Sequence, residues 1–307
     1  MKPTVSLAAS LAILAFVCPS PTNAQIGSVP EAAFGAHSLA LGRSAVASPH
    51  DALSSSWNPA SITGLEKKTA TVFLSKLPFI SDAILSSYGL VIPTQKYGSF
   101  GVSFFHFGVG GITARDNDGQ AIGTFSSKHD HLLFTYGRTF ANALAVGFNV
   151  KFVEQSLAGL DAVSENPGID FGMLYRLPGS QPLLKNLTMG IAIDNLAKPA
   201  LKLSRQREAL PRETRLMAEK EWRIGNGELT LLSNLAFPET VASRLHWGME
   251  YSYKSAIALR SGYDGNRFSA GAGVKFKALI IDYALNDQLN ESGFVSMTSA
   301  VALTYQF

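Results

Sequence analysis

The sequence predicts an all-β fold: one transmembrane antiparallel β-barrel of about 14 strands, preceded by an N-terminal hatch segment. Segment after segment alternates apolar and polar residues with a period of two, as in strands that separate two different environments. Charged residues make up only 16% of the chain, below the ~25% of a typical soluble domain, and mean hydropathy is +0.13. Beyond residue 24, no apolar run reaches the ~20 residues of a membrane helix.

Residues 1–24 are predicted to be a signal peptide. Lys2 supplies the positive charge, residues 5–17 form the apolar core, and residues 22–24 offer a small-residue cleavage site. Cleavage after residue 24 would remove Cys18, the single cysteine. We therefore expect a mature chain with no disulfide, no thiol nucleophile and no cysteine metal ligand.

Residues 25–66 are predicted to be a hatch or plug segment. This stretch is rich in small residues and does not alternate like a strand. Pro59 disfavours a helical conformation at Asn58, so a turn is expected there. A periplasmic tail is the simpler alternative, but three large apolar side chains need burial, which the barrel mouth would provide: Trp57, Ile62 and Leu65.

Residues 67–307 are predicted to form the barrel itself. Their connections alternate between short and long, as in outer-membrane barrels with short periplasmic turns and longer extracellular loops. An even number of strands then leaves both termini in the periplasm. The longest connection, residues 108–129, contains an Asp118-Gly119 hairpin signal, which predicts a small β-ribbon above the membrane.

Residues 295–307 predict the last strand and the compartment. One face of this segment is apolar and the other is small or polar. The apolar face ends on aromatic residues, as expected for an aromatic girdle in outer-membrane lipid. It also resembles the assembly signal by which bacterial barrels are recognised by the barrel-assembly machinery. The residues of this signal are Val301, Leu303, Tyr305 and Phe307.

Charged residues of both signs are expected to face the lumen. A lumen of a single sign would predict an ion-selective pore, whereas mixed signs predict pairing across strands. A barrel of about 14 strands is wider than the eight that side chains can fill and narrower than an open porin. A barrel of this width with a hatch inside is expected to be a conduit for hydrophobic molecules or a platform on which proteins dock. The main luminal charges are Arg244, Glu250, Arg260, Lys275 and Asp282.

Motifs for catalysis, metal binding or nucleic-acid binding are sparse. The chain contains no Gly-x-Ser-x-Gly elbow, His-Glu-x-x-His or phosphate-binding loop. His129 and His131 would share one strand face, but a third metal ligand is not evident nearby. Net charge is +3 and spread along the sequence. We therefore expect a protein that is not an enzyme, uses no cofactor or metal and binds no nucleic acid.

The predicted hatch contains a set of small-residue and turn motifs that includes Gly35, Gly42, Asp51, Trp57, Asn58, Pro59 and Ala60. These N-terminal motifs resemble those of the PorV/PorQ proteins, which belong to the broader group of FadL-like outer-membrane barrels. The resemblance continues at residues 147–151, 247–251 and 259–263. It implies an outer-membrane protein that handles or docks cargo of a type IX secretion system, with secreted proteins or other secretion components as partners. The alternative is a FadL-like passive channel for small hydrophobic molecules.

Overall fold

The computed structural model describes residues 35–45, 47, 49–77, 83–94, 96–141, 143–179, 184–203, 206–289 and 295–307. The predicted signal peptide, residues 1–24, lies outside these ranges, as do residues 25–34 of the predicted hatch.

Strands dominate the described chain, and its few helical turns precede them. The helical elements are α1 (Ala36–Ala40), η3 (Ser54–Ser56) and η4 (Pro59–Gly64). The strands are β1 (Thr69–Leu77), β2 (Ala83–Thr94), β3 (Gly98–Arg115), β4 (Ala121–Phe140), β5 (Leu144–Leu157), β6 (Leu160–Val163), β7 (Gly168–Arg176), β8 (Leu187–Ala197), β9 (Ala200–Leu203), β10 (Gln206–Ala209), β11 (Glu213–Ile224), β12 (Gly227–Pro238), β13 (Arg244–Tyr253), β14 (Ile257–Tyr263), β15 (Phe268–Phe276), β16 (Leu279–Leu289) and β17 (Val295–Gln306).

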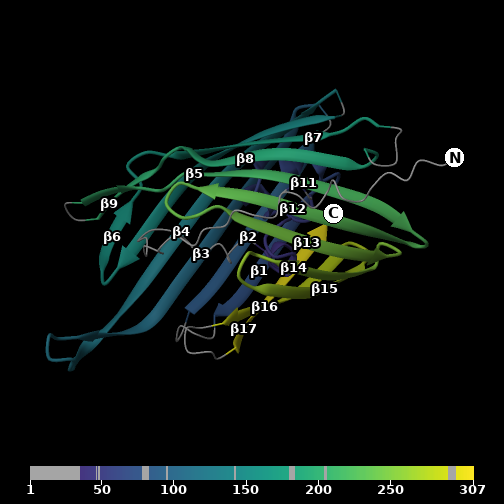
Figure 1. Cartoon of the computed structure of the whole chain (residues 1–307). Coiled ribbons are helices and arrows are strands. Elements are labelled where there is room, and N and C mark those ends of the chain that lie inside the picture. Colours follow the sequence, from purple (N-terminus) through teal and green to yellow (C-terminus); the bar gives the residue numbers. More distant parts are fainter. Residues whose placement is uncertain are drawn as a thin grey trace.

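The strands form a closed barrel (Figure 1). Neighbours along the chain pair antiparallel around the wall, and β17 pairs with β1 to close it, with Thr69 opposite Gln306. The fifteen-stranded sheet consists of a closed ring of fourteen strands and β6, which pairs with β5 alone. The predicted antiparallel barrel of about 14 strands is confirmed. Closure leaves the ring without a free edge, as a strand structure in lipid requires.

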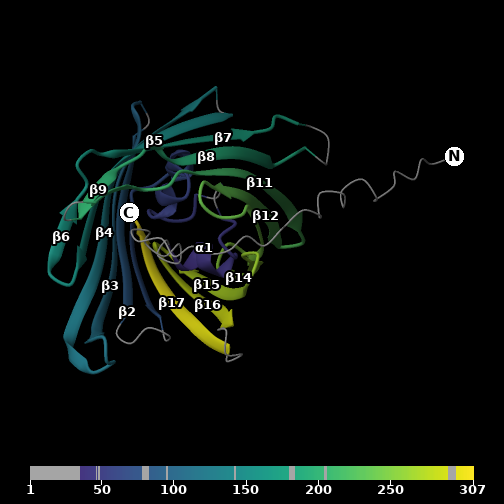
Figure 2. The same cartoon turned by 60° about the vertical axis from the view of Figure 1, so that its left-hand side comes forward.

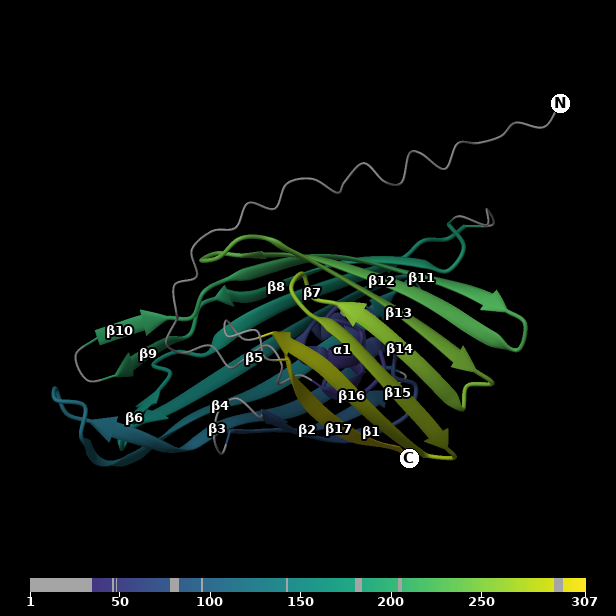
Figure 3. The same cartoon turned by 60° about the horizontal axis from the view of Figure 1, so that its bottom comes forward.

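The two ends of the barrel differ (Figure 3). Tight turns join β2–β3, β4–β5, β11–β12, β13–β14 and β15–β16 at one end, which we call the short-turn end. At the other, the loop end, β3 and β4 continue past the ring as the predicted β-ribbon, and β9 and β10 form a separate hairpin. The predicted alternation is less regular than expected, because residues 264–267 make a tight turn at the loop end.

The outer face of the ring is apolar along its length. In β17 the outward-facing Val301, Leu303 and Tyr305 are exposed, while Ala302 and Thr304 between them are buried. Phe307 lies against Tyr305 with ring centroids 5.7 Å apart. These predicted assembly-signal residues therefore lie on the lipid-facing side. Alternation produces this arrangement because successive side chains of a strand point to opposite faces.

A charge placed in the middle of this apolar face should destabilise the barrel. Val150 lies outward near the centre of β5 and is 40% exposed. We expect Val150→Arg to lower the free energy of unfolding by about 2–4 kcal/mol, the cost of an arginine at the bilayer midplane. The control Ser156→Arg, near the loop end of the same strand, should cost about 0–1 kcal/mol. Urea unfolding in lipid vesicles measures both; equal costs would refute this membrane placement.

The segment before β1 lies inside the ring (Figure 2). We call residues 35–65 the hatch. Its α1 packs against β15, β16 and β17, while η4 packs against β4, β5 and β7 on the other side of the lumen. The hatch therefore spans the barrel interior from wall to wall. Within the described chain, neither α1 nor any other helix has the length and apolarity to cross a membrane.

Candidate functional site

One turn of the hatch is seated against glycines of the wall. Asn58 caps η4, with its Oδ1 accepting a hydrogen bond from the Ala60 backbone N–H at 3.0 Å, and Pro59 follows as the first residue of the turn. A Cβ added at Gly172 would collide with Asn58 Oδ1, and one added at Gly147 would lie 2.5 Å from the Ala60 nitrogen. Gly147 on β5 and Gly172 on β7 thus form a seat for this turn, because a side chain at either position would occupy the space of the turn.

A second turn of the hatch has a similar seat on another part of the wall. Gly42 has φ +60 and approaches the backbone of Tyr263, so any side chain there would be both strained and blocked. On β13 and β14, a Cβ at Gly248 or Gly262 would collide with Leu41. His246 Nδ1 lies 3.1 Å from the Gly42 carbonyl, to which it donates a hydrogen bond.

Between the two seats, single side chains hold the hatch. The Trp57 ring is buried under the Arg215 guanidinium, 5.3 Å from the ring centroid, and Arg215 donates a hydrogen bond to the Trp57 carbonyl at 3.3 Å. Asp51 is buried, and its Oδ1 accepts the Leu53 N–H at 2.9 Å. Burial raises the pKa of Asp51. The hatch is therefore fixed by polar contacts as well as by shape.

A buried charge cluster joins the hatch to three strands. We call it the hatch–wall cluster. The His37 and His50 rings stack at 3.7 Å with an interplanar angle of 6°. His37 Nε2 lies 3.1 Å from Glu250 on β13, and His50 Nε2 lies 2.8 Å from Asp282 on β16. Arg260 on β14 bridges the two carboxylates, at 2.5 Å from Glu250 and 2.6 Å from Asp282. The cluster members are His37, His50, Glu250, Arg260 and Asp282.

The two stacked histidines differ in protonation. Burial, the neighbouring His50 and Arg260 together lower the pKa of His37 to about 4. Burial also opposes protonation of His50, but the Asp282 carboxylate outweighs it and raises the pKa of His50. At neutral pH His37 is therefore neutral and donates a hydrogen bond to Glu250, and His50 is the more readily protonated of the two histidines.

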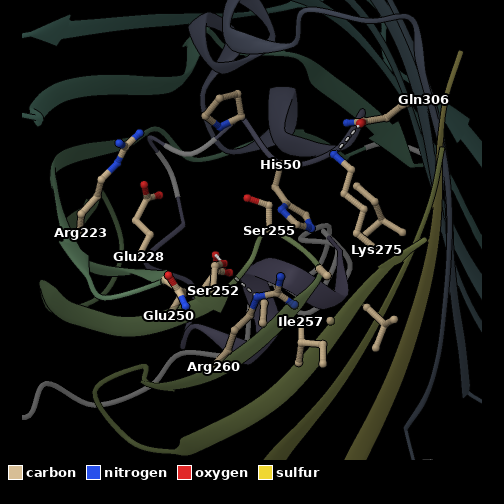
Figure 4. A pocket seen from close by; sticks show the side chains of 18 of the residues that line it. His50, Arg223, Glu228, Glu250, Ser252, Ser255, Ile257, Arg260, Lys275 and Gln306 are labelled. Carbon is tan, nitrogen blue, oxygen red and sulfur yellow. Dashed lines mark hydrogen bonds and ion pairs between the residues drawn. The ribbon is translucent and has the colours of Figure 1, made fainter. Parts of the chain in front are cut away.

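A cavity of about 520 Å³ opens at the short-turn end, below the hatch. Pro49 and His50 of the hatch line one side, and residues of β11 to β17 and of their short turns line the rest (Figure 4). Glu250 and Arg260 of the cluster point into it. Most of its other side chains are polar or charged, among them Arg223, Glu228, Ser252, Ser255, Lys275 and Gln306.

The opposite part of the lumen contains an apolar group, set among serine, threonine and histidine side chains. Inward-facing side chains of β1 to β4 form one buried group that reaches the hatch residues Leu39 and Leu53. Val109 pairs with Ala83 near the loop end, so the group runs from that end down to the hatch. We call it the apolar strip. It consists of Phe73, Ala83, Leu85, Phe105, Phe107, Val109 and Leu133.

The structure brings the predicted luminal charges together unevenly. Glu250, Arg260 and Asp282 meet in the cluster, whereas Lys275 lines the cavity rim and donates to Gln306 Oε1 at 3.2 Å. Arg244 lies on the inward register at the loop end of β13, away from the cluster. The hatch residues predicted from the motifs lie at the seats and beside them: Gly35 at the start of α1, Gly42, Asp51, Trp57, Asn58, Pro59 and Ala60.

His37 and His50 were not predicted as site residues from the sequence. Their carboxylate partners lie 213 and 232 positions away, and neither histidine belongs to a recognisable motif. One signal could have drawn attention to them: both histidines belong to a segment that is expected to lie inside a lumen lined by charged residues.

Comparison with known proteins identifies the fold. No protein-family model matches the sequence, and no curated protein matches it. Among solved structures, the Ralstonia pickettii toluene transporter TbuX matches over 89% of this chain and 98% of its own, with 15% identity and a TM-score of 0.60. The Pseudomonas putida toluene transporter TodX matches over 92% and 98%, with 13% identity and a TM-score of 0.61. A Pseudomonas aeruginosa FadL homologue matches over 89% and 98%, with 13% identity and a TM-score of 0.58.

The chain therefore has a FadL-like outer-membrane β-barrel fold. At these identities the likeness extends to the fold alone. The FadL-like part of the resemblance drawn from the sequence is confirmed, and the narrower PorV/PorQ resemblance gains no support from the comparisons.

Proposed function

We propose that this chain is a passive, non-enzymatic channel for small hydrophobic molecules across the outer membrane. Its short turns lie in the periplasm and its loop end faces outward. Molecules enter at the loop end, follow the apolar strip to the hatch and leave through the polar cavity at the short-turn end once the hatch shifts.

The apolar strip is the observation that carries this proposal. A water-filled barrel has a polar interior, whereas here Phe, Leu and Val side chains at inward-facing positions of four neighbouring strands form one continuous buried group, beside inward-facing serine, threonine and histidine residues. Leu85, Phe105 and Leu133 are almost wholly buried. Apolar lining with a few polar groups is the usual chemistry of sites for hydrophobic ligands. The hatch at the end of the strip explains how such a barrel avoids leaking water-soluble solutes.

The similar structures support the same choice. TbuX and TodX are described as toluene transporters, and CymD as a monoaromatic hydrocarbon channel with a TM-score of 0.61. Fold similarity is an argument by analogy, so the strip remains the main support. The role in type IX secretion implied by the PorV/PorQ resemblance has no comparable support, since neither the strip nor the hatch suggests a protein cargo.

A polar group within the strip should impair transport. We expect Leu133→Gln to reduce uptake of a monoaromatic hydrocarbon about tenfold, because loss of an apolar contact along the path costs about 1–3 kcal/mol. The control Thr230→Gln places the same side chain on the polar inward face of β12. Uptake of radiolabelled toluene by cells that express each variant at equal outer-membrane levels measures the effect.

Three outcomes count against the channel. Equal uptake by both variants would show that the strip is not the path. Uptake no faster than in cells without the protein would refute transport of this class of molecule. A deletion strain with normal hydrocarbon uptake and secreted proteins trapped in the periplasm would favour the secretion role instead.

A further inference from the structure

Basic side chains lie over aromatic rings at the short-turn end of the barrel. Lys96 lies 5.3 Å from the ring centroid of Tyr97, Arg138 5.8 Å from Phe140, Lys220 5.4 Å from Trp222, Lys254 5.2 Å from Tyr253 and Lys277 5.4 Å from Phe276. The five pairs belong to the ends of strands spread around the wall, from β3 and β4 through β11 to β13 and β15. We call them the basic–aromatic ring.

The rings of these pairs mark an edge of the lipid-facing surface. All five aromatic side chains are exposed, from 38% for Trp222 to 68% for Phe276. Aromatic residues form girdles at the two boundaries of the apolar band of a barrel. A lysine or arginine beside such a ring can keep its aliphatic stem on apolar surface and its charge in the headgroup layer. The cations of the ring therefore lie at headgroup depth.

The charges of the two barrel ends are partnered differently. At the loop end Lys128 pairs with Asp130 at 2.7 Å, Lys198 with Glu239 at 2.5 Å and Arg207 with Glu165 at 3.0 Å. Within the described part of the chain, no carboxylate pairs with the four cations Lys96, Arg138, Lys254 and Lys277. Lys220 donates a hydrogen bond to the Lys185 carbonyl. In the described chain these three loop-end cations are thus paired with carboxylates, whereas four cations of the basic–aromatic ring are not.

We propose that the basic–aromatic ring binds the phosphate groups of anionic phospholipids, and so anchors the short-turn end in the phospholipid leaflet of the outer membrane. A cation over a ring face is held in place while its N–H groups remain available to phosphate oxygens. Near an anionic membrane surface each basic residue contributes about 1 kcal/mol of attraction, which corresponds to roughly fivefold in affinity. This surface is separate from the transport path and does not depend on it.

The lipid that remains with the protein tests this proposal. Protein is reconstituted in bilayers of equal parts phosphatidylglycerol and phosphatidylcholine, extracted in mild detergent, and its co-purified lipid is quantified by mass spectrometry. We expect phosphatidylglycerol to be enriched at least about fivefold, and the enrichment to fall towards one in high salt, where exposed charges are screened. Equal retention of the two lipids would overturn the proposal.

A matched pair of variants assigns the binding to the ring. The ring variant carries Lys96→Gln, Arg138→Gln, Lys254→Asn and Lys277→Asn; asparagine suits the last two because both have positive φ. Lys220 is kept because it holds a backbone carbonyl. The control carries Lys128→Gln, Lys198→Gln and Arg207→Gln at the loop end. We expect the enrichment to disappear in the ring variant and to persist in the control. Enrichment that survives in the ring variant would refute the assignment.

A spectroscopic measurement locates the lipid. Trp222 belongs to the ring, and with Trp247→Phe the other remaining tryptophan is the buried Trp57 of the hatch. Brominated phosphatidylglycerol should then quench the fluorescence more than brominated phosphatidylcholine at equal content. Preferential quenching by brominated lipopolysaccharide over phosphatidylglycerol would place this end in the opposite leaflet and overturn the proposal.

Discussion

Gly147→Ala is expected to push the hatch away from the wall and make the barrel leak. The new methyl group would meet the backbone of Pro59 and Ala60, with the Ala60 nitrogen only 2.5 Å away, and backbone in a capped turn cannot swing aside as a flexible side chain can. Overpacking of this kind costs about 1–3 kcal/mol. If the strain falls on hatch docking, the undocked population should rise roughly 5- to 150-fold. Entry of a bulky antibiotic that the wild type excludes should rise with it.

Gly101→Ala is the matched control for this prediction. Gly101 lies on the wall at β3, but the nearest neighbours of an added Cβ there would be the side chains of Thr135, Val91 and Ile62, at 3.3 Å or more. Trp57 reports hatch docking directly once Trp222 and Trp247 are replaced by phenylalanine. We expect a red-shifted Trp57 emission in Gly147→Ala and an unchanged one in Gly101→Ala. The same emission and permeability in both variants would show that the glycine seat does not hold the hatch.

The barrel could be predicted from the sequence because its determinant is local. Alternation decides which side chains of a strand face lipid, as Val301, Leu303 and Tyr305 show, and it requires no knowledge of the neighbouring strands. It also placed Glu250, Arg260 and Asp282 on the inward face. The sequence did not predict which of these charges meet, because that depends on the register between β13, β14 and β16 and on the position of the hatch.

The hatch contacts were harder to predict for a physical reason. Gly147 and Gly172 look like ordinary weak positions within strands, where glycine lacks a side chain to pack. Their role in seating the hatch becomes evident only in the folded chain, where Asn58 and Pro59, about a hundred residues earlier in the sequence, lie against them. The short hairpin of β9 and β10 also could not be predicted from the sequence, since four-residue strands are too short to show a clear alternation of apolar and polar residues.

The hatch–wall cluster should make hatch docking depend on pH in two opposite ways. The pKa of His50 is raised. Its contribution to the stability of hatch docking is therefore complete below about pH 6.5 and is lost as the pH rises through the raised pKa. The pKa of His37 is lowered to about 4, so docking weakens as the pH falls below about 6.5, where the undocked histidine takes up a proton more readily. Docking of the wild-type hatch should therefore be strongest near pH 6.5 and weaker on both sides.

Asp282→Asn should remove the alkaline half of this dependence and loosen the hatch at all pH values. The substitution takes away the carboxylate that holds both His50 and Arg260, and loss of one partner of a buried ion pair costs about 3–5 kcal/mol. Without Asp282, burial and the Arg260 charge outweigh the Glu250 carboxylate, so the pKa of His50 is no longer raised. Trp57 emission should then stop changing with pH above neutrality, while the acid half set by His37 persists. Glu228→Gln is the control, since Glu228 lines the same cavity without belonging to the cluster. An alkaline half that survives in Asp282→Asn would mean that another group senses the proton and that the pairing of His50 with Asp282 does not hold the hatch.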